Sequence, residues 1–352
     1  MRFASATFIS AILCAAVACT GSKDKPVEGE ATPPQPVTQE PQPTAQDPAA
    51  TQTPEEKERE ERKRRVAESL EEAKKEAETE KQRWTEEMRA QAAKLVETDY
   101  KDAKTALQAI LASPHRQPDN AARDPHRHPL ETLTFFGIKP DTTMLEVGAG
   151  GGWYTEILAP LLAKKGKYIV TSGDPNGPDD QMSTVYGTRM KLFIESSPEL
   201  YGKVEVSHVS PPDKLELAPA GTVDVAMAIR EMHGWQRRGF MDKYLAAVFT
   251  ALKPGGTFGV VQHRAKPDAD PTKSAETGYL PEEWVIQTVE KAGFKLVEKS
   301  EINANPKDTK DYEDGVWTLP PNYALGDKDR DKYQAIGESD RMTLKFVKPE
   351  SK

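Results

Sequence analysis

The stretch Met144-Leu145-Glu146-Val147-Gly148-Ala149-Gly150-Gly151-Gly152-Trp153 joins a short apolar run to a glycine-rich turn. The run 144–147 is typical of a buried strand in a parallel sheet, and it carries the acidic residue Glu146 near its end. The amphipathic residues 153–162 that follow the turn predict a helix. Glycines in such a turn let the backbone approach a ligand, and they leave the first helical N–H groups directed at it.

Outside this stretch, the residues after Ile138 alternate short apolar runs with amphipathic segments. That alternation is typical of a parallel sheet whose strands are connected by crossover helices, so we predict an α/β fold with a seven-stranded sheet. The expected strands are residues 144–147, 167–172, 203–209, 223–228, 257–263, 295–302 and 341–347. The expected helices between them include residues 153–162, 240–252 and 281–292.

A dinucleotide-binding site is the nearest alternative for the glycine turn. Its fingerprint, G-x-G-x-x-G, needs a third small residue where the helix packs on the strand, but counting from Gly148 that position is Trp153. The pattern here is an acid followed by glycines at alternate positions. It suits a nucleoside that carries an amino acid and no phosphates.

The glycine turn and the segment Leu252-Lys253-Pro254-Gly255-Gly256-Thr257-Phe258-Gly259-Val260-Val261 together resemble the first and fifth strands of a class I methyltransferase that uses S-adenosyl-L-methionine (SAM). The chain is most similar to a family of predicted bacterial methyltransferases with export signals. This resemblance lies in HPLE (128–131), GGWYTE (151–156), EINANPKD (301–308), GVWTLPP (315–321) and GESDRM (337–342). It implies a Rossmann-like methyltransferase sheet flanked by helices, within residues 99–348, and SAM as the cofactor; it implies no particular substrate.

The resemblance places the cofactor residues at the carboxyl ends of the strands. Gly148, Gly150 and Gly152 would form the floor under the methionine part of SAM, and Glu146 would face its ammonium group. Asp174 is the candidate for the ribose hydroxyls, although it lies beyond the position where the family more often carries the acid. An ordinary turn residue is the alternative for Asp174, and the adenine contact is left unassigned.

Residues 229–235 follow the fourth predicted strand, where class I enzymes place the groups nearest the transferred methyl. Methyl transfer is an in-line displacement, so the protein mainly aligns the nucleophile with the sulfonium. His233 is the candidate general base, and Arg230 is the candidate cation that orients an acidic substrate. A histidine that only caps or packs a helix is the alternative. His263 and Arg264, which end the fifth strand at the same edge, are candidate substrate-binding residues.

The connection between the last two strands, residues 303–340, is much longer than a hairpin needs. Because the seventh strand of this fold runs antiparallel, both ends of the connection emerge on the ligand side, and we predict a lid. A surface flap with Trp317 as a core plug is the alternative. The candidate wall residues are Asn303, Asn305, Trp317, Asp340 and Arg341.

The first third of the chain predicts a tether. Residues 1–19 have the layout of a secretory signal, and AVACTG (16–21) resembles a bacterial lipoprotein cleavage box. The resemblance implies that Cys19 becomes lipidated, which would anchor the protein to a membrane of the bacterial cell envelope, outside the cytoplasm. An exported protein cut nearby is the alternative. Residues 20–54, rich in Pro, Gln and Thr, predict a disordered linker.

Residues 55–98 predict a charged helix that begins at the capping box Thr53-Pro54-Glu55-Glu56. Its apolar stripe is thin, and the heptad pattern fails at Glu80 and Glu87. We therefore expect a solvated helix, with self-association as a stalk as the alternative.

The net charge of -8, with no evident basic face, argues against nucleic-acid binding. The histidines show no metal-ligand spacing, so no metal site is predicted. The leading hypothesis is SAM-dependent methyl transfer to a small molecule or a component of the cell envelope. Two alternatives stay open: a non-catalytic module of the same fold that binds a nucleoside or metabolite, and an envelope scaffold that acts through the charged helix.

Overall fold

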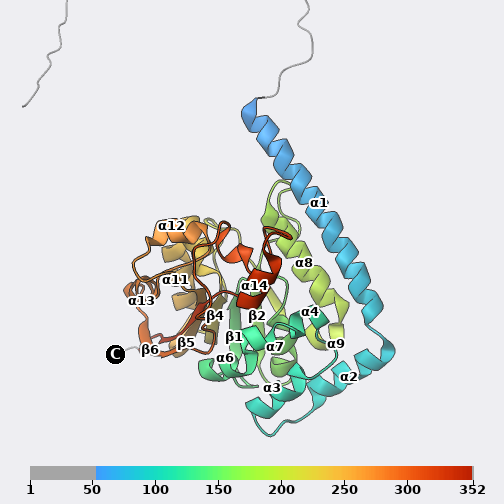
Figure 1. Cartoon of the computed structure of the whole chain (residues 1–352). Helices are drawn as coiled ribbons and strands as arrows, with labels where there is room; N and C mark the ends of the chain where they lie inside the picture. The colour runs from blue at the N-terminus through green and yellow to red at the C-terminus, as the bar shows by residue number, and fades with distance from the viewer. Residues whose placement is uncertain (1–52, 351–352) are drawn as a thin grey trace, which may run out of the picture. The chain divides into compact units, whose positions relative to one another are not determined.

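The structure, a computed structural model, describes residues 53–350, so the predictions for Cys19, for residues 1–19 and for most of the linker lie outside the described residues. Its strands form a seven-stranded sheet in the order β3-β2-β1-β4-β5-β7-β6 (Figure 1). Strands β1 to β5 pair in parallel, whereas β7 runs antiparallel between β5 and β6. This topology confirms the predicted Rossmann-like methyltransferase fold.

The strand bounds agree closely with the predicted ones. The strands are β1 (Thr143–Val147), β2 (Lys167–Ser172), β3 (Glu205–His208), β4 (Val223–Ile229), β5 (Leu252–His263), β6 (Lys295–Ser300) and β7 (Arg341–Val347). The fifth strand begins earlier than predicted because Leu252 already pairs with Val223, ahead of a bulge in the ladder. The predicted start of this strand, residue 257, is therefore five residues too late.

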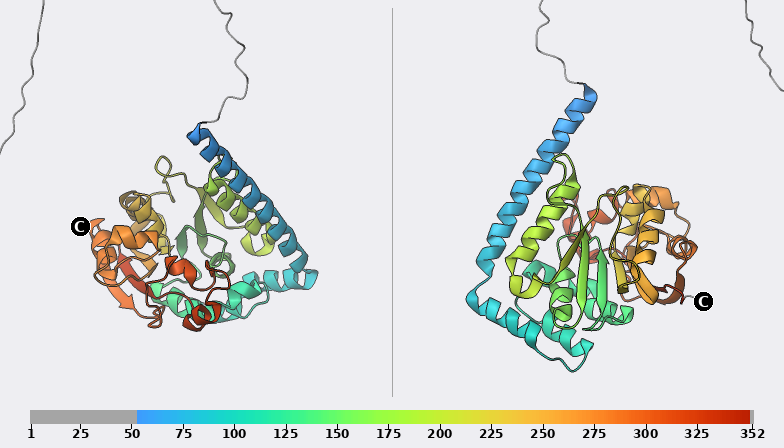
Figure 2. Two further views of the ribbon diagram at one scale, coloured as in Figure 1. Left: turned by 45° about the horizontal axis from the view of Figure 1, so that its top comes forward. Right: turned by 180° about the vertical axis from the view of Figure 1, so that it is seen from behind.

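Helices cover both faces of the sheet (Figure 2). Met144 and Leu145, which are adjacent in β1, are fully buried and belong to different hydrophobic cores. This arrangement explains the unbroken apolar run, because a strand covered on both sides needs apolar residues at every position. The first core packs under α3 (Ala103–Leu111), α6 (Pro129–Phe136), α7 (Thr155–Leu162), α8 (Met182–Ser196) and α9 (Pro198–Tyr201). The second packs under α10 (Met232–Arg237), α11 (Met241–Ala251) and α13 (Glu282–Lys291).

The remaining short helices lie in the connections. They are α4 (Pro118–Ala121), α5 (Asp124–Arg127), α12 (Pro271–Glu276), the 3-10 helix η1 (Gly315–Thr318) and α14 (Arg330–Ile336). The first two precede the sheet and the last two belong to the long connection between β6 and β7. Helices α4, α5, η1 and α14 therefore lie in irregular parts of the chain, where hydrophobic periodicity predicts secondary structure least well.

The charged segment predicted as one helix over residues 55–98 is two helices, α1 (Pro54–Arg83) and α2 (Glu86–Glu97). The predicted capping box is present at the start of α1. The break falls at Trp84, whose ring is buried in edge contact with Tyr201 of the folded domain. Thr85 then caps α2 by accepting a hydrogen bond from the backbone N–H of Met88.

Helix α1 runs along α8 (Figure 1), whereas the sequence predicts a solvated helix. Val66 and Ala73 are only 1% and 3% exposed, and ion pairs border this contact. These pairs are Arg59–Asp180, Lys63–Asp179, Arg189–Glu72 and Arg189–Glu76. Some of the charged side chains of α1 thus form ion pairs with the folded domain.

Within residues 53–350, no helix combines the length and apolar character that crossing a membrane requires.

Candidate functional site

A cavity of about 640 Å3 lies where β1 and β4 end, and the glycine turn forms its floor. Gly148 and Gly150 have φ angles of +77° and +56°, which side chains other than glycine adopt with strain. A Cβ atom on Gly148 would lie 2.5 Å from the Glu231 carboxyl carbon, so that glycine is also required by packing. A Cβ atom on Gly150 would meet nothing within 4 Å. The backbone at Gly150 is therefore open to a ligand.

Two carboxyl groups lie beside this turn. Glu146, at the end of β1, is 3% exposed and accepts a hydrogen bond from the Tyr168 hydroxyl of β2. Burial raises the pKa of Glu146 to about 7. Burial, reinforced by the charge of Glu146, raises the pKa of Glu231, the second residue after β4, to about 8. A cationic ligand group next to them would favour their ionised forms, so this side of the cavity suits an ammonium or a sulfonium.

Two histidines meet a tryptophan at another part of the cavity. The His233 ring lies 5.7 Å from that of His263 and 5.9 Å from that of Trp317, measured between centroids. Gln262 Nε2 lies 3.4 Å from His233 Nδ1, and His263 Nδ1 lies 2.5 Å from Ser339 Oγ. Burial lowers the pKa of His233 to about 4 and that of His263 well below its ordinary value. Both rings are therefore neutral near pH 7, and a neutral imidazole is the form that accepts a proton.

Four arginines surround one buried carboxylate in a further part of the cavity, which we call the arginine wall. Glu338 is 5% exposed, and it accepts from Arg123 Nε at 2.9 Å, Arg127 Nε at 3.2 Å and Arg341 Nη1 at 3.0 Å. Arg230 Nη1 lies 3.9 Å away. Although burial opposes it, the arginine charges hold the pKa of Glu338 below its ordinary value. One carboxylate among four guanidinium groups leaves an excess of positive charge.

The structure brings most of the predicted cofactor and catalytic residues to this cavity, but not all of them. Those that line it are Glu146, Gly148, Gly150, Arg230, His233, His263 and Trp317. Gly152 instead packs against Phe193, whose ring a Cβ atom would approach to 2.9 Å. Asp174 is exposed and accepts from the N–H of Asn176 at 2.9 Å, which is the turn role that the sequence left as its alternative.

The long connection between β6 and β7 does contribute a wall of the cavity, through Trp317 and Pro320, Pro321 and Asn322. The other predicted wall residues hold the connection in place and do not line this cavity. Asn303 donates to the hydroxyls of Thr132 and Thr343, and Asn305 donates to the carbonyls of Ile336 and Glu338. Asp340 pairs with Lys310 at 2.7 Å, Arg264 with Glu301 at 2.6 Å, and Arg341 with Glu338.

Sequence reasoning missed five charged residues of the cavity, namely Arg123, Arg127, Arg189, Glu231 and Glu338. Arg123 and Arg127 lie in a polar segment before the sheet, where charged residues are usually solvated, so no local pattern marks them. Glu231 had a usable signal, because it follows Arg230 directly at the end of β4. Glu338 has one partner nearby in the sequence, Arg341, whereas Arg123, Arg127 and Arg230 are distant in the sequence.

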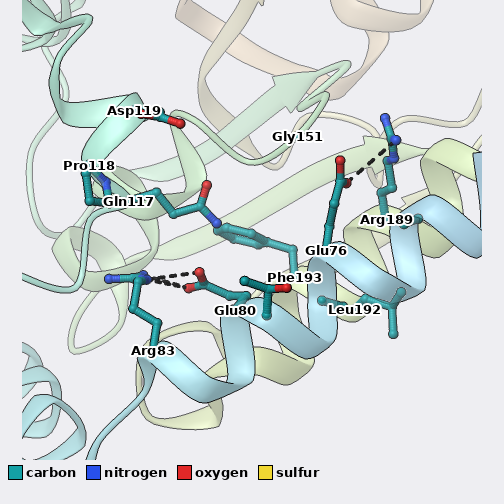
Figure 3. A pocket seen from close by; sticks show the side chains of 13 residues that line it. Glu76, Glu80, Arg83, Gln117, Pro118, Asp119, Gly151, Arg189, Leu192 and Phe193 are labelled. Carbon is teal, nitrogen blue, oxygen red and sulfur yellow. Dashed lines mark hydrogen bonds and ion pairs between the residues drawn. The ribbon is translucent and has the colours of Figure 1, made fainter.

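A second cavity, of about 580 Å3, lies between α1, α8 and the segment around Pro118 (Figure 3). Both arginines that line it are paired with glutamates of α1: Arg83 with Glu80 at 2.6 Å and Arg189 with Glu76 at 3.6 Å. It touches the glycine turn only at Gly151. The first cavity, whose floor is the glycine turn, is therefore the candidate site.

Among residues 53–350 no group of acidic residues, histidines and cysteines is arranged to hold a metal ion.

No model of a known protein family matches the chain, and no curated protein matches its sequence. Solved structures do resemble it. A SAM-dependent methyltransferase from Aquifex aeolicus is 18% identical with a TM-score of 0.42, over 65% of this chain and 94% of that one. The geranyl diphosphate C-methyltransferase from Streptomyces coelicolor, solved with Mg2+, geranyl diphosphate and S-adenosylhomocysteine, is 11% identical with a TM-score of 0.43, over 69% and 84%.

A third solved structure is the 1,6-didemethyltoxoflavin-N1-methyltransferase of Burkholderia thailandensis, with bound 1,6-didemethyltoxoflavin and S-adenosylhomocysteine. It is 16% identical with a TM-score of 0.37, over 66% of this chain and 80% of that one. At these identities and TM-scores, the likeness concerns the fold alone.

Proposed function

We propose that the cavity binds SAM and that the protein transfers its methyl group to a small molecule or a component of the cell envelope. The observation that carries the proposal is the glycine turn at the cavity floor, open to a ligand at Gly150 and bordered by Glu146. An acid beside the turn suits the ammonium group of the cofactor, and a second one, Glu231, adds to the affinity for positive charge. The backbone of the turn is available to bind the cofactor, and its spacing of glycines does not match the fingerprint of a pyrophosphate-binding turn.

The chemistry is an in-line displacement. A lone pair of the acceptor forms the new bond to the methyl carbon, and the electrons of the breaking carbon–sulfur bond remain on sulfur, which becomes a neutral thioether. If the acceptor atom carries a proton, His233 takes it, because burial keeps this imidazole neutral near pH 7. The low pKa makes His233 a weak base, so alignment of the reactants contributes more than proton removal.

Calorimetry on the full chain tests this proposal with S-adenosylhomocysteine, the demethylated product, as the probe. We expect a Kd in the micromolar range for the natural chain and at least about a tenfold loss for Gly150→Ala, because a methyl group there would occupy ligand space. Gly221→Ala is the matched control, since Gly221 also has a positive φ, of +65°, and open space around its Cβ position, but lies outside the cavity.

Absence of binding by a chain that still unfolds cooperatively contradicts the proposal, and so does equal affinity of the two glycine variants. The formation of S-adenosylhomocysteine distinguishes a transferase from the alternative, a non-catalytic binding module. If that alternative holds, the natural chain binds SAM but does not form S-adenosylhomocysteine with any acceptor, whereas a transferase forms it in step with methylated acceptor.

A further inference from the structure

The Arg230 guanidinium has an unusual place in the cavity. The residue follows β4 with a left-handed φ of +62°, and its N–H donates to Val261 O at 2.7 Å, so the backbone aims the side chain into the cavity. Within residues 53–350 the guanidinium donates no hydrogen bond, and its ion pair with Glu338 is long, at 3.9 Å. The side chain is 25% exposed. Its planar set of donors is therefore available to a ligand.

Arg123 and Arg127 add further donors on the same wall. Each uses its Nε to bond Glu338, and for the part of the chain described here neither uses its terminal Nη groups. The Arg127 guanidinium lies 4.9 Å from the centroid of the Trp153 ring, which fixes its plane. Arg341 differs, because its Nη2 is occupied by the carbonyl of His126. Three arginines thus present unused donors to one cavity.

We infer that the methyl acceptor carries an anionic group, a carboxylate or a phosphate, and that Arg123, Arg127 and Arg230 bind it. The inference rests on the proposed function. Guanidinium groups bind such anions through paired hydrogen bonds, and Glu338 keeps two of the three oriented without cancelling the total charge. Arg230 and His233 line the same cavity, so an anion bound to Arg230 leaves the rest of the acceptor in the space that His233 also lines.

The position of the cluster also explains why an anion is needed. SAM would bring a positive sulfonium into a cavity whose lining, taken as a whole, includes four arginines and three glutamates. An acceptor without negative charge would leave that repulsion in place, whereas an anionic acceptor offsets it and draws the nucleophile toward the sulfonium. The carboxylate of the cofactor itself is the competing source of negative charge, and the experiment must separate the two.

Calorimetry on the full chain saturated with S-adenosylhomocysteine provides the test, with inorganic phosphate and sodium acetate as separate probes. We expect at least one anion to bind, and Arg230→Met to weaken it at least about tenfold. Arg237→Met is the matched control, since it removes the same charge from an exposed site outside the cavity and should change the affinity less than about twofold. Preference for phosphate over acetate, or the reverse, identifies the group.

Three results would overturn the inference. If S-adenosylhomocysteine binds but neither anion does, the inference fails and the proposed function stands. If an anion binds but S-adenosylhomocysteine does not, the proposed function fails, and the acceptor assignment fails with it. If Arg230→Met and Arg123→Met weaken S-adenosylhomocysteine but not 5′-methylthioadenosine, which lacks the amino-acid part, the arginines hold the cofactor carboxylate. Equal thermal unfolding midpoints show that the variants are folded.

Discussion

Two parts of the cavity lining have opposite effects on the pKa of a buried glutamate. The glycine wall is the glycine turn with Glu146 and Glu231, and the arginine wall is Glu338 with the arginines that bond to it. Beside the glycine turn, burial raises the pKa values of Glu146 and Glu231 to about 7 and about 8. On the arginine wall, Glu338 is buried as well, yet its pKa lies below the ordinary value because guanidinium groups surround it. Burial alone therefore does not set the charge of a carboxyl group. The partners do, and here they make one wall ready for a cation and the other for an anion.

The largest expected effect is on the arginine wall, where Glu338→Gln removes the carboxylate that Arg127 and Arg341 share. Both arginines are 3% exposed and would be left without their countercharge. We expect a loss of about 3–5 kcal/mol in the free energy of unfolding, measured with urea. Glu313→Gln is the control: it breaks an exposed ion pair with Lys328, with 2.8 Å between the charged atoms, and should change the free energy of unfolding far less. Equal losses would contradict the comparison of the walls.

A smaller effect, with a defined pH dependence, is expected on the glycine wall for Glu231→Gln. Because the folded-state pKa of Glu231 is about 8 and the ordinary value is 4.5, the unfolded chain loses this proton first as pH rises. The natural chain therefore loses stability between pH 5 and pH 8, and the variant lacks that contribution. The stability of the variant relative to the natural chain should rise by about 3 kcal/mol over this range, since one unit of pKa shift corresponds to about 1.4 kcal/mol.

Thermal or urea unfolding at several pH values measures this difference. The titrations of other groups are shared by both proteins and do not enter it. Glu283→Gln, which removes an acidic side chain at an exposed position on α13, is the control. A flat difference for Glu231→Gln would mean that the Glu231 carboxyl is not kept protonated by the fold.

The smallest expected effect concerns Asp174, which lies outside both walls. Its carboxylate already accepts the N–H of Asn176 and is exposed, so Asp174→Ala should change the affinity for S-adenosylhomocysteine by less than about threefold. Calorimetry on the full chain measures this. A loss of tenfold or more would instead assign Asp174 to the ribose and extend the binding surface beyond the cavity.

The glycine wall was predictable from the sequence and the arginine wall was not. The turn residues, Glu146 and the start of β1 are neighbours in the chain, and a strand covered on both faces has a recognisable apolar pattern. Arg123 and Glu338, by contrast, are separated by 215 positions, and each is an ordinary charged residue of an irregular segment. The contact exists only because β7 returns the chain to the sheet beside β5.

The same reasoning explains the error over α1. Its charges follow the pattern of a solvated helix, and only two of its side chains, Val66 and Ala73, are buried. Whether such a helix is solvated or packed depends on the opposing surface, here Asp179, Asp180 and Arg189 in and before α8. Periodicity within one segment contains no information about charges that another segment supplies.

Arg189 belongs at once to the rim of the ligand cavity and to the contact with α1, through Glu72 and Glu76. A ligand that draws this guanidinium toward itself must loosen its hold on the helix, and one that leaves it in place preserves the hold. For a ligand that displaces Arg189, binding in the cavity and the contact of α1 with α8 are linked equilibria, and each then influences the other by the same factor. A change that weakens the α1 contact would in that case alter the affinity for the ligand.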